Sequence, residues 1–297
     1  MKSARIARSS ALLAALLLLA GPAPAQVSTP AQATKALKTV VKFELKNLKK
    51  QLAEEVAEFS DAVHVFEDAV TADEPDLVAA AQQLVAAWNA AELAMYDWMA
   101  THREVVVFDA SDILGEYQAA VGGVMGGPYP FGFHPGDGGA LDDFEQGVRD
   151  AAEKARDQLQ TRLGKLSKPL AKAGLKIGVQ TRPLQVLQAF AFNADAAGDF
   201  PATINNASFG IDLLLTIDPV DGTEDALIVL AGSCSASAAV HVDVGGPGGL
   251  PTLDADVAGS ADGRWDAILG SAHEGNYTVA ATNSGDASSV HDQLGAG

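Results

Sequence analysis

An apolar repeat of three and four residues is the feature that most constrains how this chain can fold. From Pro30 to about Val70, apolar residues recur about once per helical turn, at Leu37, Val41, Leu45, Leu48, Leu52, Val56, Phe59, Val63, Phe66 and Val70. A repeat of this period gives a helix one apolar face that must be covered. The sequence therefore predicts one long, amphipathic helix from Pro30 to Val70.

The same spacing continues after a turn-like segment from Thr71 to Asp76, at Leu77, Ala81, Leu84, Trp88, Ala91, Met95 and Trp98. We expect this second helix to fold back antiparallel on the first, with coiled-coil-like contacts. The β-branched run Val105 to Val107 predicts an interruption, and Asp109 to Asp112 can cap a short third helix. A last helix is expected from Leu141 to near Gly174. Residues 26–182 are thus predicted to form an antiparallel helical bundle.

A Gly- and Pro-rich segment, residues 122–139, interrupts this helical pattern. Its composition excludes regular structure, and a loop of this length in a compact domain is uncommon. It carries four candidate binding side chains, Tyr129, Phe131, Phe133 and His134. Two interpretations stay open: a connection whose aromatic rings pack against the bundle, or a ligand-binding loop.

The composition changes after Arg182, where lysine disappears and short apolar stretches alternate with turn clusters. Strands are expected at Val186–Phe192, Ser208–Ile217, Ala226–Ala231, Ala238–Val244, Arg264–Leu269 and Asn276–Ala281. Short strands between turn signals are typical of a β-sandwich. We therefore expect residues 183–297 to be an all-β module.

Part of this module, Ala226 to Ala287, resembles the bacterial immunoglobulin-like domains. The resemblance is carried by Leu230-Ala-Gly-Ser-Cys-Ser-Ala-Ser-Ala-Ala-Val240, Ala261-Asp-Gly-Arg-Trp265 and Glu274-Gly-Asn-Tyr-Thr-Val-Ala-Ala281. It implies an immunoglobulin-like sandwich with Trp265 and Tyr277 in the core and with Gly263 and Gly275 at turns. It also implies a spacer, display or adhesion module and no particular chemistry.

The first residues predict export. Lys2, Arg5 and Arg8 precede an Ala/Leu run from Ala11 to Ala20, and Ala23-Pro24-Ala25 supplies small residues for cleavage. This is the pattern of a signal peptide over residues 1–25, because the apolar run is shorter than the roughly 20 residues of a membrane span. We expect a secreted protein, periplasmic or extracellular, without stable membrane insertion.

The formal net charge of −18 disfavours binding to nucleic acids, whose phosphates it repels. The sequence contains no zinc-protease, serine-hydrolase or phosphate-loop motif, so we expect no enzymatic activity and no cofactor. Turn acids suit calcium, and four of them form a candidate calcium site: Asp218, Asp221, Glu224 and Asp225.

Two groups of basic residues lie on the predicted bundle. The first helix carries Lys35, Lys38, Lys42, Lys46 and Lys49, and the last carries Arg162, Lys165, Lys168 and Lys172. If these helices run antiparallel, both groups meet at one end. Three interpretations are open: solvated faces with local ion pairs, docking of the acidic β-module, or binding of an envelope polyanion or another protein. The β-module has fifteen acids against the single base Arg264.

These patterns together predict a secreted, non-catalytic interaction or scaffold protein of the bacterial cell envelope or exterior. The alternative is a calcium-dependent carbohydrate-binding protein that acts through the β-module. Calcium-dependent thermal stabilisation would favour that alternative.

Overall fold

The computed structural model describes residues 27–72, 76–122, 128–134, 136–181, 210–219, 226–234, 239–245, 253–260, 263–272, 275–283 and 289–296 of the 297-residue chain. The expected signal peptide, residues 1–25, and the expected strand at Val186–Phe192 lie outside these residues.

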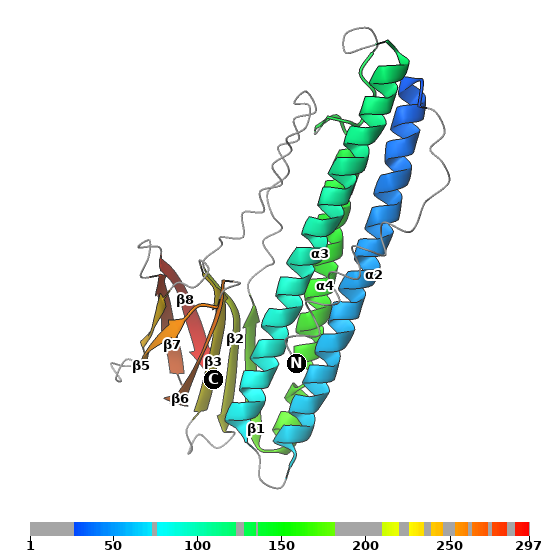
Figure 1. Ribbon diagram of the computed structural model, residues 1–297. Helices are drawn as coiled ribbons and strands as arrows, with labels where there is room; N and C mark the ends of the chain where they lie inside the picture. Colours follow the sequence, from blue (N-terminus) through cyan, green and yellow to red (C-terminus); the bar gives the residue numbers. More distant parts are fainter. Residues whose placement is uncertain are drawn as a thin grey trace.

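In the first half of the chain, the described residues form three long helices and one short helix (Figure 1). They are α2 at Pro30–Val70, α3 at Leu77–Ala120, α4 at Ala140–Gly164 and α5 at Ser167–Lys172. The helix expected from Pro30 to Val70 is confirmed. A capping box fixes its start, because Thr29 accepts the N–H of Gln32 and the Gln32 side chain accepts the N–H of Thr29. Asp76 caps α3 by accepting the N–H of Ala79 at 3.0 Å.

The expected break at Val105 to Val107 is wrong, because α3 continues through it to Ala120. Val106 and Val107 are buried in the bundle, as are Ala110 and Leu114 after them. The helix penalty of a β-branched residue is below about 1 kcal/mol, and burying an apolar side chain outweighs it. The short third helix expected from Asp109 is therefore the last part of α3.

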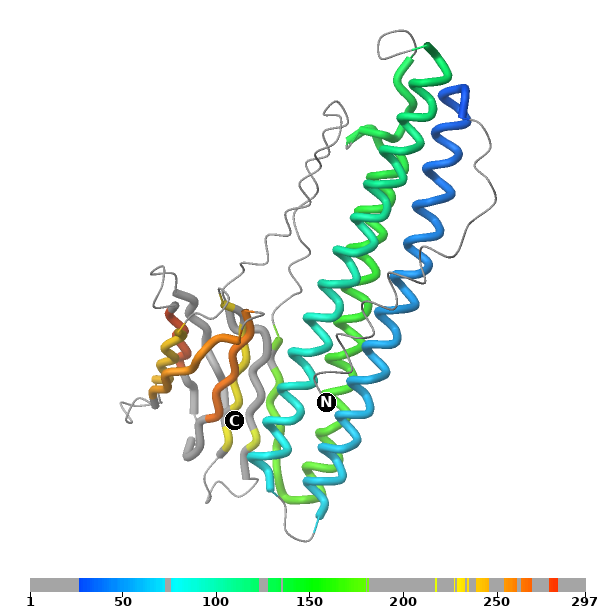
Figure 2. Tube along the Cα trace, in the orientation of Figure 1, coloured from blue at the N-terminus to red at the C-terminus, as the bar shows by residue number. Residues whose placement is uncertain are grey.

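The three long helices α2, α3 and α4 alternate in direction along the bundle. Along α3 the polar contacts proceed from Glu92 to Arg103, while their partners on α4 proceed backwards from Arg156 to Glu145. Trp98 and His102 likewise contact α2 in descending order. Both α2 and α4 are therefore antiparallel to α3 and parallel to each other, as Figure 2 shows.

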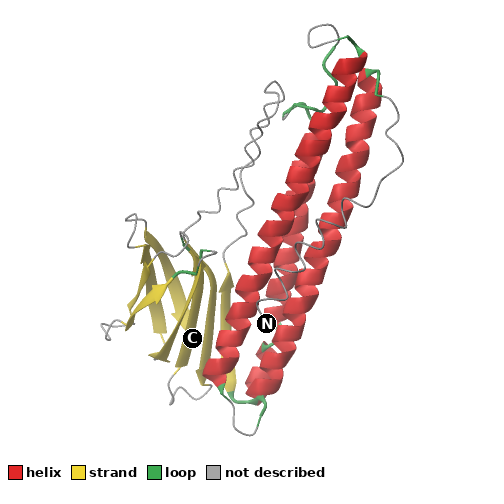
Figure 3. Cartoon of the chain, viewed as in Figure 1, coloured by secondary structure: helices red, strands yellow, loops and turns green. Residues whose placement is uncertain are grey.

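The described strands of the second half form two four-stranded antiparallel sheets (Figure 3). The first has the order β1-β2-β3-β6, with strands Leu175–Thr181, Gly210–Pro219, Ala226–Ser233 and Arg264–Ala272. The second has the order β5-β4-β7-β8, with strands Leu253–Ala258, Ala239–Gly245, Gly275–Asn283 and Ser289–Ala296. The strands expected from Ser208 onward are confirmed to within a few residues, whereas β1, β5 and β8 were not predicted.

The last helical segment ends near Gly174, as expected, although it is divided into two helices. α4 stops at Gly164 and α5 at Lys172, and Gly174 then adopts a φ of 76°, which favours glycine. The chain next enters β1, which pairs with β2 from Leu175 opposite Pro219 to Thr181 opposite Leu213. The first sheet therefore begins before residue 183, inside the region expected to be wholly helical.

The first sheet packs against the bundle. Ile217, Leu227, Val229 and Ala231 belong to the same apolar cluster as the buried residues of the helices, and α3 contacts β3 and β6. In Figure 1 the strands lie on the α3 side of the bundle, with α2 on the far side. Trp265 is buried, as the immunoglobulin-like resemblance implies, and Gly263 has the positive φ of a turn residue.

The immunoglobulin-like resemblance also names Gly275 and Tyr277. Gly275 is the first residue of β7, and the side chain of Tyr277 lies outside the described part of the structure. Cys234 is buried and forms no disulfide.

Candidate binding surface on the helical bundle

The loop before α4 is fixed to the helices on both sides. The Tyr117 hydroxyl at the end of α3 donates to the carbonyl of Pro128 at 2.8 Å. The Thr34 hydroxyl, in the first turns of α2, donates to the carbonyl of Phe131 at 2.9 Å. Phe133 is fully buried. The described part of this loop therefore packs on the end of the bundle.

Three glycines and one carboxylate set the path of this loop into α4. Gly132 has a φ of 91°, and a Cβ there would lie 2.9 Å from the backbone nitrogen of Ala140. Asp142, in the first turn of α4, accepts the N–H groups of Gly136 at 2.8 Å and Gly138 at 2.7 Å. The hydrogen bond from Gly136, with help from Gly138, lowers the pKa of the Asp142 carboxyl from its usual 3.8. A charged carboxylate thus holds the loop.

The four aromatic candidates of the loop have different positions. Phe133 belongs to the core, whereas Phe131 is 54% exposed. Tyr129 stacks on His134 with ring centroids 4.1 Å apart and an interplanar angle of 20°. The loop therefore presents Phe131 and the stacked Tyr129–His134 pair at the surface, while Phe133 anchors it.

The five lysines of α2 form one exposed stripe. Lys35, Lys38, Lys42, Lys46 and Lys49 are all exposed, whereas Glu44, within the same segment, is buried against α3. None of the five has an ion pair or hydrogen bond from its side chain within the described ranges. The stripe starts next to Thr34, whose hydroxyl holds the aromatic loop. We call the stripe, the exposed rings of Tyr129 and Phe131 and the half-buried ring of His134 the tip surface.

The second basic group is far from the tip surface. Arg162 and Lys165 lie at the end of α4, and Lys168 and Lys172 lie in α5. Because α2 and α4 run parallel, the two groups lie at opposite ends of the bundle, and the expectation that they meet is wrong. The lysine stripe lies instead at the level of the acidic start of α4, where Gly147 packs against Leu45.

The β region contacts the helices through a positive charge, whereas its acids were expected to contact basic residues of the helices. Arg264 on β6 lies 3.3 Å from Glu92 on α3, and Arg156 on α4 pairs with the same carboxylate. The guanidinium of Arg264 also lies over the ring of Tyr96. An intramolecular contact between the β region and a helix is thus present. Its base comes from the β region and its acid from the helix.

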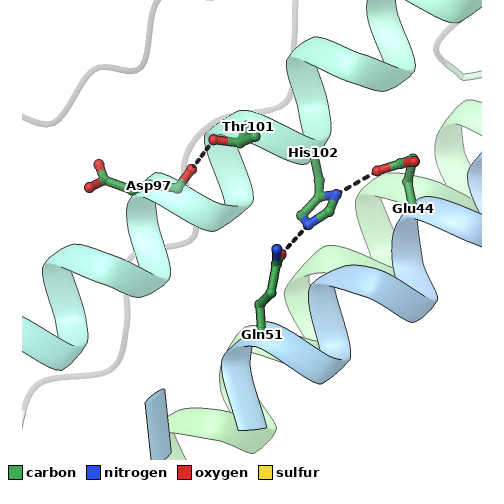
Figure 4. Close-up of polar contacts among 5 residues, drawn as sticks. All are labelled: Glu44, Gln51, Asp97, Thr101 and His102. Atoms are coloured by element: carbon green, nitrogen blue, oxygen red, sulfur yellow. Dashed lines mark hydrogen bonds and ion pairs between the residues drawn. The ribbon is translucent and has the colours of Figure 1, made fainter. Parts of the chain in front are cut away.

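Several charged side chains lie inside the bundle, and sequence reasoning missed them. Figure 4 shows His102 on α3 between two residues of α2: its Nδ1 lies 2.6 Å from Glu44, and its Nε2 is hydrogen-bonded to Gln51. Arg103, the next residue, pairs with Glu145 on α4 at 3.0 Å. Polar contacts therefore join α3 to both of its helical neighbours.

A sequence signal for these buried charges does exist. Arg156 lies four residues after the buried Ala152 and three before the buried Leu159, and Glu92 has the same relation to Trp88 and Met95. Charged residues that keep the apolar rhythm point inward. In α2 the apolar pattern named Leu45, which is half-buried against the core, but missed the buried Glu44 beside it.

The carboxyl of Asp109, near this network, has a raised pKa. Burial raises the pKa of the Asp109 carboxyl from its usual 3.8, and the negative charges of Glu44 and Asp112 raise it further. This places Asp109 among the acids that gain a proton most readily as the pH falls.

The candidate calcium residues are mostly outside the described structure. Asp221, Glu224 and Asp225 are not described, and Asp218 is described only as a backbone partner of Lys176 in the first sheet. In the described part of the chain, no group of three or more His, Cys, Asp or Glu side chains could hold a metal ion. The calcium hypothesis stays an untested prediction.

Comparisons with known proteins give no relative for this chain: no protein-family model matches it, and no curated protein matches it. Among the described helices, none is both long enough and apolar enough to cross a membrane.

Proposed function

We propose that this protein is an exported, non-catalytic interaction or scaffold protein of the bacterial cell envelope or exterior. In this proposal the helical bundle carries the specific binding surface. The β region is an immunoglobulin-like sandwich that supports it. The basic and apolar start of the chain supports export, and the absence of catalytic motifs from the sequence supports a binding role.

The lysine stripe on α2 is the observation that carries the proposal. None of these lysines lies in the last turn of α2, where the helix dipole would favour a positive charge, so the dipole does not explain them. They contribute no ion pair to the described fold either, and the base that contacts the β region is Arg264. Five ammonium groups along one exposed face can follow a linear chain of negative charges.

The aromatic part of the tip surface favours a polysaccharide over a small anion. Phe131 and the stacked Tyr129–His134 pair offer flat apolar faces, and hydrogen bonds from Thr34 and Tyr117 fix the loop that carries them. Sugar rings present apolar C–H faces, while acidic groups along the same polymer can reach the lysines. The proposed ligand class is therefore an acidic envelope polysaccharide, either a free polymer or the glycan of a lipopolysaccharide.

Titration calorimetry with an acidic polysaccharide, and separately with lipopolysaccharide, tests this proposal. We expect the wild-type protein to bind at low salt, with affinity falling as salt screens the charges. Replacing Lys35, Lys38, Lys42, Lys46 and Lys49 with Gln should abolish binding. The matched control replaces Arg162, Lys165, Lys168 and Lys172, at the other end of the bundle, and should leave binding intact. Equal losses in the two variants, or no binding by the wild type, would contradict the proposal.

A further inference from the structure

The outer face of α2 carries a second pattern beside the lysine stripe. Phe43 and Val65 are both 56% exposed, although the rest of the large apolar residues of α2 are buried or half-buried. They lie about six helical turns apart, roughly 33 Å at 1.5 Å per residue, and on nearly the same side of the helix. Lys50, Glu54 and Asp61 lie between them, so the five positions follow one another at steps of seven and four residues.

The charges along α2 are divided between its two halves. All six lysines lie between Lys35 and Lys50, and six acids lie between Glu54 and Asp68. Lys50 and Glu54 meet at the boundary, where they form an exposed ion pair of 3.6 Å. Such a helix is complementary to a reversed copy of itself, because the basic half of each then faces the acidic half of the other.

We propose that the outer face of α2 is an antiparallel dimer interface between two copies of this chain. A two-fold axis beside Glu54 places Phe43 of each copy opposite Val65 of the other, because both residues are equally far from Glu54. The same axis brings Lys50 opposite Glu58, and Lys46 next to Asp61, in both halves of the interface. A parallel pair would instead align lysines with lysines and acids with acids, which is unfavourable.

The described helices and strands leave this face of α2 available. α2 packs against α3 and α4 with its other side, where Leu48, Leu52 and Val56 are buried. The strands lie on the α3 side of the bundle (Figures 1 and 2). The interface and the exposed lysine stripe share Lys46, while the other four lysines of the stripe lie beside the interface, so the dimer would carry two tip surfaces at opposite ends. The inference does not depend on the proposed function.

Sedimentation equilibrium of the mature chain over a range of concentrations tests the association. We expect the wild type to dimerise, and the exposed substitution Phe43→Ser to weaken the dimer at least tenfold without changing the circular dichroism spectrum. Thr39→Ser, on the same helix, is the control. A wild type that stays monomeric at all concentrations, or a dimer unaffected by Phe43→Ser, would overturn the proposal.

Charge exchange tests the register. The double variants Lys46→Glu/Lys50→Glu and Glu58→Lys/Asp61→Lys should each be monomeric alone, because like charges then face each other. Mixed in equal amounts they should form a heterodimer, since every facing pair is again opposite in charge. Failure of the mixture to associate would show that these residues do not face each other, even if the wild type dimerises.

Cross-linking tests the direction of the two helices. A disulfide needs Cα atoms within about 7 Å, so Glu54→Cys next to the axis should form an intermolecular disulfide under mild oxidation. Asp61→Cys, which lies on the same face but seven residues from the axis, should not, because its two copies lie about 21 Å apart in an antiparallel pair at 1.5 Å per residue. The native Cys234 is buried. Cross-linking of Asp61→Cys as well as Glu54→Cys would indicate a parallel pair and would overturn the proposal.

Discussion

The inside of the bundle and the outer face of α2 use charges in opposite ways. Inside, Glu92, Arg103 and Arg156 are almost completely buried, and each is paired with a charge on a neighbouring element. Outside, the lysine stripe has no ion pair within the described residues. A buried charge without a partner is costly, so the inner charges fix which helices and strands lie together. The outer lysines carry no such constraint and are available to a ligand.

Removal of Glu92 should have the largest effect. It contacts Arg156 on α4 and Arg264 on β6, so Glu92→Ala leaves two guanidinium groups without their carboxylate. We expect a loss of about 3 to 5 kcal/mol in unfolding free energy, measured by urea denaturation. The exposed Glu104→Ala on the same helix should change it by less than about 0.5 kcal/mol. A loss below about 1 kcal/mol for Glu92→Ala would show that the inner pair does not hold the junction.

Asp142 is intermediate between the buried inner charges and the exposed outer lysines, because it is partly exposed but accepts two backbone N–H groups. Asp142→Asn should cost about 1 kcal/mol, at the low end for hydrogen bonds to a charged group. Its folded pKa lies below 3.8, so this stability is present above pH 3.8 and disappears as the pH falls through the folded pKa. Wild type and variant should therefore converge in strongly acidic urea melts, whereas Asp143→Asn should stay close to wild type at all pH values. A constant difference would refute the charge argument.

A single outer lysine should matter little for stability. Lys42→Gln should change the unfolding free energy by less than about 0.5 kcal/mol, because no described group depends on its charge. Arg103→Gln, which removes a buried charge facing Glu145, should cost several times more in the same melts. If the two losses were equal, the contrast between inner and outer charges would fail.

The smallest effect is expected for His241 in the β region. A hydrogen bond to Asp256 at 2.7 Å, together with the charge of Asp243, raises the pKa of His241 above 6.5. Its small stabilisation is present below pH 6.5 and is lost as the pH rises through the folded pKa. Proton NMR titration should show this raised pKa, and Asp256→Asn should move it toward 6.5. An unchanged titration in Asp256→Asn would show that the pair does not form in solution.

The sequence predicted α2 from Pro30 to about Val70, as observed, because its apolar residues keep the helical spacing throughout this segment. It failed for α3, since local β-branched propensity at Val105 to Val107 is weaker than burial against two helices. The sequence predicted a separate short helix between the second helix and the last one. Because this helix is part of α3, the last helix runs parallel to α2 and not antiparallel to it. The expected antiparallel arrangement had placed the two basic groups together.

The candidate site was predicted only in part. The lysine stripe and the aromatic loop are visible as composition, but whether Phe133 is an anchor and Phe131 a surface residue depends on packing. The pairing of Arg264 with Glu92 joins residues far apart in the sequence, and no local pattern specifies it. The spacing of Glu92 from the buried apolar residues of α3 could have indicated that its side chain points inward. It could not have indicated which basic residue it contacts.

Because β1 directly follows α5, the β region cannot be cut from the helices at Pro183 without losing a strand of its first sheet. Its first strand, Leu175–Thr181, is encoded directly after α5 and pairs with β2 over its whole length. A fragment that starts at Pro183 would lose this strand and leave the backbone of β2 from Leu213 to Pro219 as an open edge, which invites association with other chains. Exchange of this region between proteins would therefore have to cut within the helices, before the end of α5.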